Sequence, residues 1–250
     1  MHEVYGMESS AFQLDPSKQK ADYLSYPVVK THVLPHQLEP HDPAIPVVYL
    51  VRDGRDSVVS MAHHTKDIVH PGSDYRQNLK EIILARHGTH FGGWGNNVLT
   101  WMKRADLVIR FEDLITEPIA TVEKLRAVID LPEPQPEKLP TFDDLREKST
   151  PYGPNKNKSG QEDYGEKKKK FFRRGIAGAW KDELPLEYQE MFWFFNSEAM
   201  RAVGYTDGEM ESKANLTGWI YKFLDDHFVD EKNIEKLKNR LSASSWDFNE

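Results

Sequence analysis

The pattern of apolar residues predicts two buried strands, each followed by a helix. Residues 46–51 are continuously apolar, rich in β-branched side chains and bounded by Pro and Gly, as expected for a buried parallel strand. After a turn, residues 57–64 have helical character. Residues 105–111 indicate a second buried strand, and residues 118–129 follow as an amphipathic helix with Pro at its first turn. This alternation predicts an α/β fold with a mainly parallel sheet.

The remaining segments carry weaker patterns. Residues 15–21 could open a short helix, and residues 26–30 indicate a brief strand. From residue 131 to about residue 170 the chain is rich in Pro, Gly, Asn, Lys and Glu, which predicts a long mobile loop. Residues 186–203 return to helix, and one face is made largely of Tyr188, Met191, Phe192, Phe195 and Met200.

A carboxyl-terminal tail follows this helix. Its large apolar side chains fall at helical spacing, and they are Trp219, Ile220, Phe223, Leu224 and Phe228. Such a helix either packs on the parent domain or docks a partner. We therefore divide the chain into a domain of residues 1–205 and a helical extension of residues 206–250.

Composition limits the functional classes. The 250 residues are 38% hydrophobic, enough for one sizeable core, and we find no internal repeat. A formal net charge of −7 argues against nucleic acid as the main partner. The sequence has no cysteine, which excludes disulfides and thiolate chemistry, and no apolar run long enough to span a bilayer. We expect a cytoplasmic protein that does not bind membranes.

Three basic groups are candidates for anion chemistry. Arg52 follows the first buried strand, where the carboxyl end of a sheet strand and the next helix can hold a phosphate together with Arg55, Ser57 and Ser60. Surface salt bridges are the alternative for these side chains. Arg173 and Arg174 precede Gly175, which permits a tight backbone approach. The lysines of residues 167–170 allow a solvated charge run or a localisation signal as alternatives, but the aromatic pair of residues 171–172 argues against a pure surface run.

The third group lies at the end of the first short strand. His32 there could act as a general base, and Lys30 could stabilise negative charge on a transferred group. Taken alone, this triplet carries little weight. The order and context of the three groups are more informative than any one of them.

Three blocks in this order resemble signature blocks of cytosolic-type sulfotransferases. They are residues 27–35 (PVVKTHVLP), residues 48–60 (VYLVRDGRDSVVS) and residues 171–181 (FFRRGIAGAWK). Smaller matches are Gly93-Trp94 with Val98 and Trp101, and the strand-end block of residues 111–114. The resemblance covers roughly residues 15–205 and leaves the tail outside it.

The resemblance implies a set of roles at the matched positions. Such enzymes move a sulfuryl group from 3′-phosphoadenosine 5′-phosphosulfate (PAPS) to a hydroxyl or amine of a small molecule, without a metal. His32 would be the base and Lys30 would contact the sulfuryl group. The 3′-phosphate would be bound by Arg52 and Ser60 from one side and by Arg173, Arg174 and Gly175 from the other.

Two further assignments follow from the resemblance. Phe142 resembles a residue near the adenine, and a core anchor under the loop is the equal alternative for it. Residues 146–170 would resemble a cap that closes over cofactor and acceptor and excludes water. Dimerisation is left open, because Lys181 and Glu190 match the ends of a family pattern whose centre is replaced here by Pro185 and Leu186.

One expected part of the family pattern is not found. The implied fold is a three-layer fold like that of P-loop NTPases, with a central parallel sheet between helices, and it normally begins with a buried strand and a loop resembling Pro-Lys-Ser-Gly-Thr-Thr. No such sequence occurs here. We expect a fragment, a degenerate relative that still binds nucleotide, or an enzyme whose missing strand comes from another chain.

Two other functional classes compete with the enzyme. A pseudoenzyme would keep the 3′-phosphoadenosine nucleotide site and use its tail to bind a protein partner. A nucleotide kinase would need a Gly-x-x-x-x-Gly-Lys-Ser/Thr loop, which this sequence lacks. Steroid, phenol, flavonoid, lipid and sugar hydroxyls all remain open as acceptors.

Overall fold

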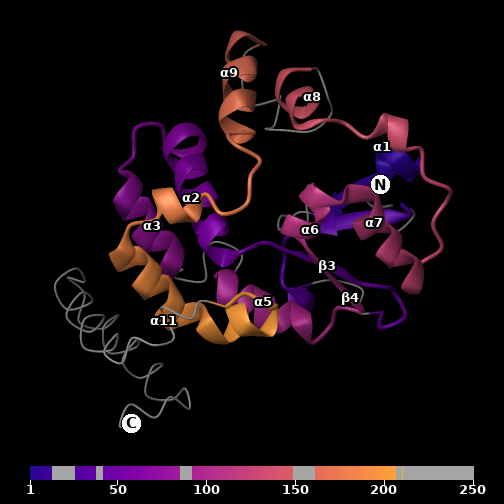
Figure 1. Cartoon of the computed structure of the whole chain (residues 1–250), viewed down its shortest axis with the longest axis horizontal. Coiled ribbons are helices and arrows are strands. Elements are labelled where there is room, and N and C mark those ends of the chain that lie inside the picture. The colour runs from indigo at the N-terminus through magenta and orange to yellow at the C-terminus, as the bar shows by residue number, and fades with distance from the viewer. Residues whose placement is uncertain (13–25, 38–41, 85–91, 149–160, 207–209, 211–250) are drawn as a thin grey trace.

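Four short strands pair in parallel (Figure 1). In the computed structural model, which describes residues 1–12, 26–37, 42–84, 92–148, 161–206 and 210, β3 (Val48–Val51) lies beside β4 (Leu107–Arg110). β1 (Ser9–Phe12) lies beside β2 (Val28–Thr31). Within the described residues these pairs are two separate two-stranded sheets. The predicted parallel α/β character is confirmed.

Helices make up most of the remaining described chain. The α-helices are α1 (His2–Tyr5), α2 (Gly54–His64), α3 (Tyr75–Leu84), α5 (Trp94–Met102), α6 (Phe111–Thr116), α7 (Pro118–Glu123), α8 (Phe142–Glu147), α9 (Gln161–Phe171), α10 (Trp180–Glu183) and α11 (Leu186–Ala202). Short 3₁₀ turns span Pro35–Gln37, Lys124–Ala127 and Pro136–Lys138, and a π-helical turn spans Thr65–Val69. The predicted helix of residues 15–21 lies outside the described residues, as does almost all of the predicted extension.

Side-chain alternation along β3 and β4 builds a core on each face of their sheet. Tyr49, Val51 and Val108 belong to a large core shared with α2, α3, α5 and α11. Val48 and Ile109 belong to a smaller core with α1 and α7. Figure 1 shows these two helix groups on opposite sides of the strands. Because successive residues of a strand face opposite ways, four-residue strands suffice to join three layers.

The larger core depends on α11. Its predicted face is confirmed, since Tyr188, Met191, Phe192 and Met200 are buried and Phe195 packs against them. Phe192 and Met191 have no exposed surface. Together with α2, α3 and α5, α11 covers one face of the sheet formed by β3 and β4. The turn that leads from β3 into α2 lies next to this core.

Three boundaries differ from the sequence prediction. The continuous loop predicted for residues 131–170 is wrong, because α8 and α9 fall within it; α8 begins at a capping box in which Thr141 and Asp144 exchange hydrogen bonds. Phe111 starts α6 instead of ending a strand. The helix predicted for residues 118–129 becomes a 3₁₀ turn after Glu123.

Gly54 allows α2 to begin in close contact with the larger core. A Cβ atom at this position would lie 2.2 Å from Cζ of Phe192 and 2.7 Å from Cδ2 of Trp94. These distances are far shorter than any carbon–carbon contact, so a side chain would displace two aromatic rings. The turn after β3 is therefore fixed by packing as well as by hydrogen bonds.

We predict that Gly54→Ala lowers the free energy of unfolding by about 1–3 kcal/mol or more, because the added methyl group overpacks the core. Gly165→Ala is the matched control, since Gly165 lies in α9 and a Cβ atom there would have no neighbouring atom within 4 Å. It should stabilise the protein by about 0.5–1 kcal/mol through helix propensity. Urea unfolding of both variants measures the difference, and equal effects would contradict the packing argument.

Candidate functional site

Arg52 connects two of the three basic groups. It follows β3, and its Nη2 donates a hydrogen bond of 2.9 Å to the carbonyl oxygen of Ile176, directly after Gly175. Its guanidinium carbon lies 4.7 Å from the centre of the Phe111 ring. The Nε atom is buried and has no hydrogen-bond partner among the described residues. A buried donor without an acceptor is costly, so an anion oxygen placed here would be stabilised.

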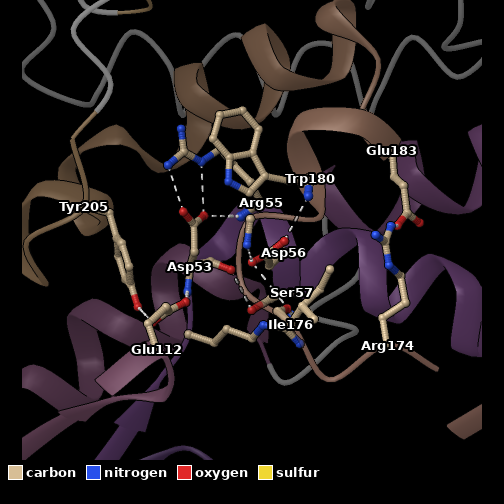
Figure 2. A network of polar contacts seen from close by, with 12 residues as sticks. Asp53, Arg55, Asp56, Ser57, Glu112, Arg174, Ile176, Trp180, Glu183 and Tyr205 are labelled. Atoms are coloured by element: carbon tan, nitrogen blue, oxygen red, sulfur yellow. Dashed lines mark hydrogen bonds and ion pairs between the residues drawn. The ribbon is translucent and has the colours of Figure 1, made fainter. Parts of the chain in front are cut away.

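Asp56 fixes the segment that Arg52 contacts. The residue is 1% exposed, and its two carboxylate oxygens accept hydrogen bonds from the amides of Gly178 (2.7 Å) and Trp180 (2.9 Å). Figure 2 shows Asp56 beside Trp180. Nη2 of Arg52 lies 3.7 Å from the same carboxylate. A single buried acid on α2 therefore positions the chain that follows the second arginine block.

Arg173 and Arg174 share one carboxylate. Their Nη1 atoms lie 2.7 Å and 2.5 Å from the two oxygens of Glu183, and Nε2 of His63 lies 2.8 Å from one of them. Figure 2 shows Arg174 and Glu183 facing each other. Burial opposes the charge of Glu183, but the hydrogen bonds from both arginines outweigh it and lower the pKa of this carboxyl group. Desolvation and the nearby Arg173 lower the pKa of His63.

Gly175 and Phe142 are in direct contact. Gly175 has a φ of 61°, and a Cβ atom there would lie 2.3 Å from Cε2 of Phe142. Phe142 also packs edge-on against Phe172, with ring centres 6.3 Å apart. Glycine is needed at residue 175 for both reasons, its positive φ and the absence of space. The contact places the half-buried Phe142 ring beside the arginine block.

A cavity of about 580 Å³ brings the third basic group, Lys30 and His32, to Arg52. Its walls include Lys30, His32, Arg52 and Ser57 together with many apolar side chains. Ser60 is exposed on α2 and is not part of these walls, and neither are Arg173, Arg174, Gly175 and Phe142. Arg52 therefore connects the two parts of the candidate site. It lines the cavity with Lys30 and His32, and it contacts the segment that follows Gly175.

His32 is exposed on the cavity wall, yet its pKa is perturbed. Nearby protein removes part of its hydration, and this desolvation, followed by the positive charge of Lys30, lowers the pKa below the ordinary value of 6.5. Both effects disfavour the imidazolium ion. The imidazole is thus mainly neutral at pH 7, which is the state a proton acceptor needs.

Sequence analysis did not predict the hydrogen bonds and ion pair within the turn after β3. Arg55, considered as a phosphate ligand, is instead buried against Asp53, with Nη2 2.8 Å from a carboxylate oxygen, and its guanidinium stacks 3.7 Å from the Trp180 ring. Asp53 also caps α2 by accepting from the Arg55 amide. Ser57 donates to the Asp53 carbonyl oxygen. The alternation of Arg and Asp in this turn was the available signal for internal pairing.

A second polar network adjoins this turn. The Asp53 amide donates to Glu112 over 3.0 Å, and the Tyr205 hydroxyl donates to the other oxygen of Glu112 (Figure 2). The guanidinium of Arg110 lies over the Tyr205 ring. These side chains, with Arg55, line an open cavity of about 480 Å³. Arg55 pairs with Asp53 in this lining, whereas the buried Nε of Arg110 has no hydrogen-bond partner among the described residues.

Comparison with known proteins identifies the family. A model of the sulfotransferase domain matches residues 2–204. The chain belongs to the sulfotransferase domain family. The match includes each of the blocks at residues 27–35, 48–60 and 171–181, on which the resemblance was based.

Curated sulfotransferases share moderate identity with this family member. Sulfotransferase 1A1 of Canis lupus familiaris is 26% identical over 175 residues, and sulfotransferase 1 family member D1 of Mus musculus is 26% identical over 178 residues. Each alignment covers 66% of this chain and 59% of the relative. The matched part thus spans about three-fifths of the length of these relatives.

Solved structures share the sulfotransferase fold. Mouse sulfotransferase SULT7A1, complexed with PAP, matches with a TM-score of 0.55 and 17% identity over 86% of this chain and 79% of its own. Retinol dehydratase, in complex with androsterone and the inactive cofactor PAP, matches with a TM-score of 0.52 and 20% identity over 78% of this chain and 57% of its own. The predicted fold class, a parallel sheet flanked by helices, is confirmed.

Neither a membrane-spanning helix nor a metal-binding cluster occurs among the described residues. Across the residues with described positions, no helix has the length and apolarity required to cross a membrane. In the same ranges, no three His, Cys, Asp or Glu side chains are grouped so that they could hold a metal ion.

We predict that Asp56→Ala lowers the free energy of unfolding by about 1–3 kcal/mol for each of the two amides that lose their acceptor. Asp56→Asn keeps one oxygen acceptor and should have a smaller effect. Asp182→Ala is the control: Asp182 is exposed on α10, and its loss should change stability by about 0.5 kcal/mol at most. Urea unfolding measures all three, and a neutral Asp56→Ala would refute the anchoring role.

Proposed function

We propose that this chain binds PAPS and transfers its sulfuryl group to a hydroxyl or amine of a small-molecule acceptor. The observation that carries the proposal is the contact between Arg52 and the carbonyl oxygen of Ile176. It joins two basic blocks that lie 124 residues apart in sequence. The family membership of residues 2–204 supports the reaction class.

In the proposed reaction, the acceptor oxygen or nitrogen attacks the sulfur of PAPS. The bond from sulfur to the bridging phosphate oxygen breaks, and PAP leaves with that electron pair. His32 accepts the proton of the acceptor, which its lowered pKa permits at neutral pH. Lys30, exposed at the end of β2, contacts the sulfuryl group or bridging oxygen and stabilises the charge that develops there.

The 3′-phosphate of the nucleotide would be held from two sides. Arg52 offers a buried Nε without a partner in the described residues, and Ser60 is exposed further along α2. Arg173, Arg174 and the backbone at Gly175 approach from the second block. Since Glu183 already pairs with both arginines, a phosphate there must share or displace this carboxylate. Phe142, which contacts Gly175, would stack on the adenine in this proposal.

A second candidate function is nucleotide binding without transfer. It applies to a chain that acts without a loop resembling Pro-Lys-Ser-Gly-Thr-Thr, a sequence that does not occur in the 250 residues. Loss of one preorganised donor for the leaving group costs about 2.7–4 kcal/mol of barrier, so loss of the whole loop would slow transfer severely. In this case PAP still binds and sulfuryl transfer is not detected.

The remaining assignments stay predictions. They are a cytoplasmic location, catalysis without a metal, a cap formed by residues 146–170, part of which lies outside the described residues, and an open question of homodimerisation. Androsterone and retinol are ligands of retinol dehydratase. They support a small apolar alcohol as the first acceptor to screen.

We predict that the double variant Arg52→Ala, Arg173→Ala loses PAP binding. Each arginine supplies a charge-assisted contact to the 3′-phosphate worth about 1.5–3 kcal/mol, so affinity should fall by about a hundredfold or more. Isothermal titration calorimetry with PAP measures it.

Arg76→Ala is the matched control for this titration. Arg76 pairs with Glu187 on the surface, and its side chain is 64% exposed, so its removal should leave PAP affinity unchanged. A folded wild-type chain that gives no heat with PAP would overturn the proposed function. Equal loss in the control variant would mean that net charge, and not the site, governs binding.

We predict that the pKa of His32 lies below 6.5 and that Lys30→Ala raises it, because the substitution removes a repelling positive charge. Folding stability should correspondingly fall as pH drops below 6.5, since the unfolded chain then binds the proton more readily than the folded chain. NMR titration of the imidazole measures the midpoint directly.

Lys66→Ala provides the control for the titration of His32, because Lys66 does not contribute to the lowered pKa. It should leave the His32 midpoint unchanged. A midpoint at or above 6.5 in the wild-type chain would remove the electrostatic basis for His32 as a base at neutral pH.

A further inference from the structure

Glu183 is held in place from two helices of the larger core. Its backbone carbonyl oxygen accepts a hydrogen bond of 3.0 Å from the Tyr75 hydroxyl on α3. One of its carboxylate oxygens lies 2.8 Å from Nε2 of His63 on α2, and a carboxylate only accepts, so the imidazole is the donor. The rings of Tyr75 and His63 are themselves in contact, with centres 4.6 Å apart. The backbone and the carboxylate of Glu183 are therefore both fixed at the end of α10.

Arg173 and Arg174 reach Glu183 from the loop between α9 and α10. Nη1 of Arg173 lies 2.7 Å from one carboxylate oxygen, and Nη1 of Arg174 lies 2.5 Å from the other. A phosphate presents a similar arrangement of oxygens to a pair of guanidinium groups. No other carboxylate among the described residues forms an ion pair with either arginine. Glu183 thus occupies the charged groups of the second arginine block in the manner expected of a bound anion.

Exposure distinguishes this cluster from the ion pair in the turn after β3. The side chains of Arg55 and Asp53 are 8% and 9% exposed, so separating them would leave an uncompensated buried charge. The side chains of Arg173 and Arg174 are 29% and 41% exposed, and ion pairs of exposed groups contribute little net stability. These two arginines can therefore exchange one anion for another, whereas Arg55 cannot.

His63 gives the acid a partner that remains after such an exchange. The side chain of Glu183 is only 16% exposed, and a carboxylate at that depth needs a hydrogen bond. His63 belongs to α2, so its contact with Glu183 does not depend on the loop that carries the arginines. Glu183 can therefore release both guanidinium groups without being left unpaired.

We propose that Glu183 is an internal competitor for the 3′-phosphate. Its carboxylate pairs with Arg173 and Arg174 until the phosphate displaces it, and it then keeps His63 as its partner. The inference rests on the proposed function, because that function assigns the two arginines to the 3′-phosphate. A phosphate monoester carries a charge of about −1.5 to −2 at neutral pH and three acceptor oxygens, so it prevails over a carboxylate of single charge.

This competition has a specific consequence for affinity. Glu183 weakens the binding of nucleotides that carry a 3′-phosphate, because two ion pairs must be broken first. It has no effect on nucleotides that lack this group. When PAP leaves, the carboxylate returns to the arginines and replaces the departing phosphate, which favours release.

The test compares PAP with adenosine 5′-monophosphate (AMP), which lacks the 3′-phosphate. Glu183→Gln keeps the shape of the side chain and one oxygen acceptor, but it removes the charge that holds both arginines. PAP should bind to this variant about tenfold more tightly than to the wild-type chain. The affinity for AMP, measured by its competition with PAP, should not change. Isothermal titration calorimetry at fixed ionic strength measures both nucleotides.

Asp182→Asn is the matched control. It removes the same charge from the neighbouring residue, which is exposed on α10 and forms no ion pair in the part of the chain that the structure describes. Its charge is screened by solvent, so PAP affinity should change by less than about twofold. A gain equal to that of Glu183→Gln would assign the effect to net charge and overturn the inference.

Urea unfolding verifies that each variant is folded. If Glu183→Gln does not fold, Glu183→Asp replaces it in the test. The aspartate carboxylate is one methylene further from the arginines, and this variant should bind PAP about threefold more tightly than the wild-type chain.

The outcomes separate this inference from the proposed function. If the wild-type chain binds PAP and the folded variant binds it equally or more weakly, the inference is wrong and the proposed function stands. Weaker binding would identify Glu183 as a positioning residue for the two arginines. Equal tightening of AMP also overturns the inference, since the gain would not depend on the 3′-phosphate. If neither the wild-type chain nor the variant gives heat with PAP, the proposed function fails and the inference fails with it.

Discussion

The buried carboxylate of Asp56 is the interaction on which the candidate site depends. It has almost no exposed surface, and it accepts hydrogen bonds from the amides of Gly178 and Trp180. Removing an acid from water is expensive unless its oxygens are hydrogen-bonded, so these two amides are required partners for the acid. The same contacts hold the segment after the arginine block against the end of β3. The carboxylate of Asp56 can therefore be buried only when the segment of residues 178–180 is in place beside it.

The sheet that precedes Asp56 is predictable from sequence because its signal is local. The apolar run of residues 46–51 and its β-branched composition indicated β3, and the run of residues 105–111 indicated β4. The buried face of α11 was also predictable from the sequence, because its apolar side chains recur at helical spacing. Helix α8 was missed because it is stabilised by a capping box and by the contact of Phe142 with Gly175, and α9 was missed because most of its residues are polar, so neither has a periodic apolar pattern.

The sequence predicted which residues belong to the candidate site better than it predicted which of them contact one another. The order of the three sequence blocks indicated Arg52, Arg173 and Arg174 as site residues. In the structure, Arg52 donates a hydrogen bond to the carbonyl oxygen of Ile176. Sequence reasoning did not foresee that Arg55 would be neutralised by Asp53 and covered by Trp180, or that Glu183 would hold both later arginines. Asp53 lies two residues before Arg55, and Glu183 lies nine and ten residues after the two later arginines. Several acidic residues lie at such short distances, and the sequence does not show which of them each arginine will contact.

The separation between Asp56 and its two amides also sets an order of events during synthesis. These contacts span 122 and 124 residues. A ribosome adding about 5–20 residues per second exposes Asp56 on the order of ten seconds before residues 178–180 exist. Throughout that interval the carboxylate lacks both amide donors, so burying it would be costly. Hydration of this acid therefore favours an open end of β3 until most of the matched domain has been made.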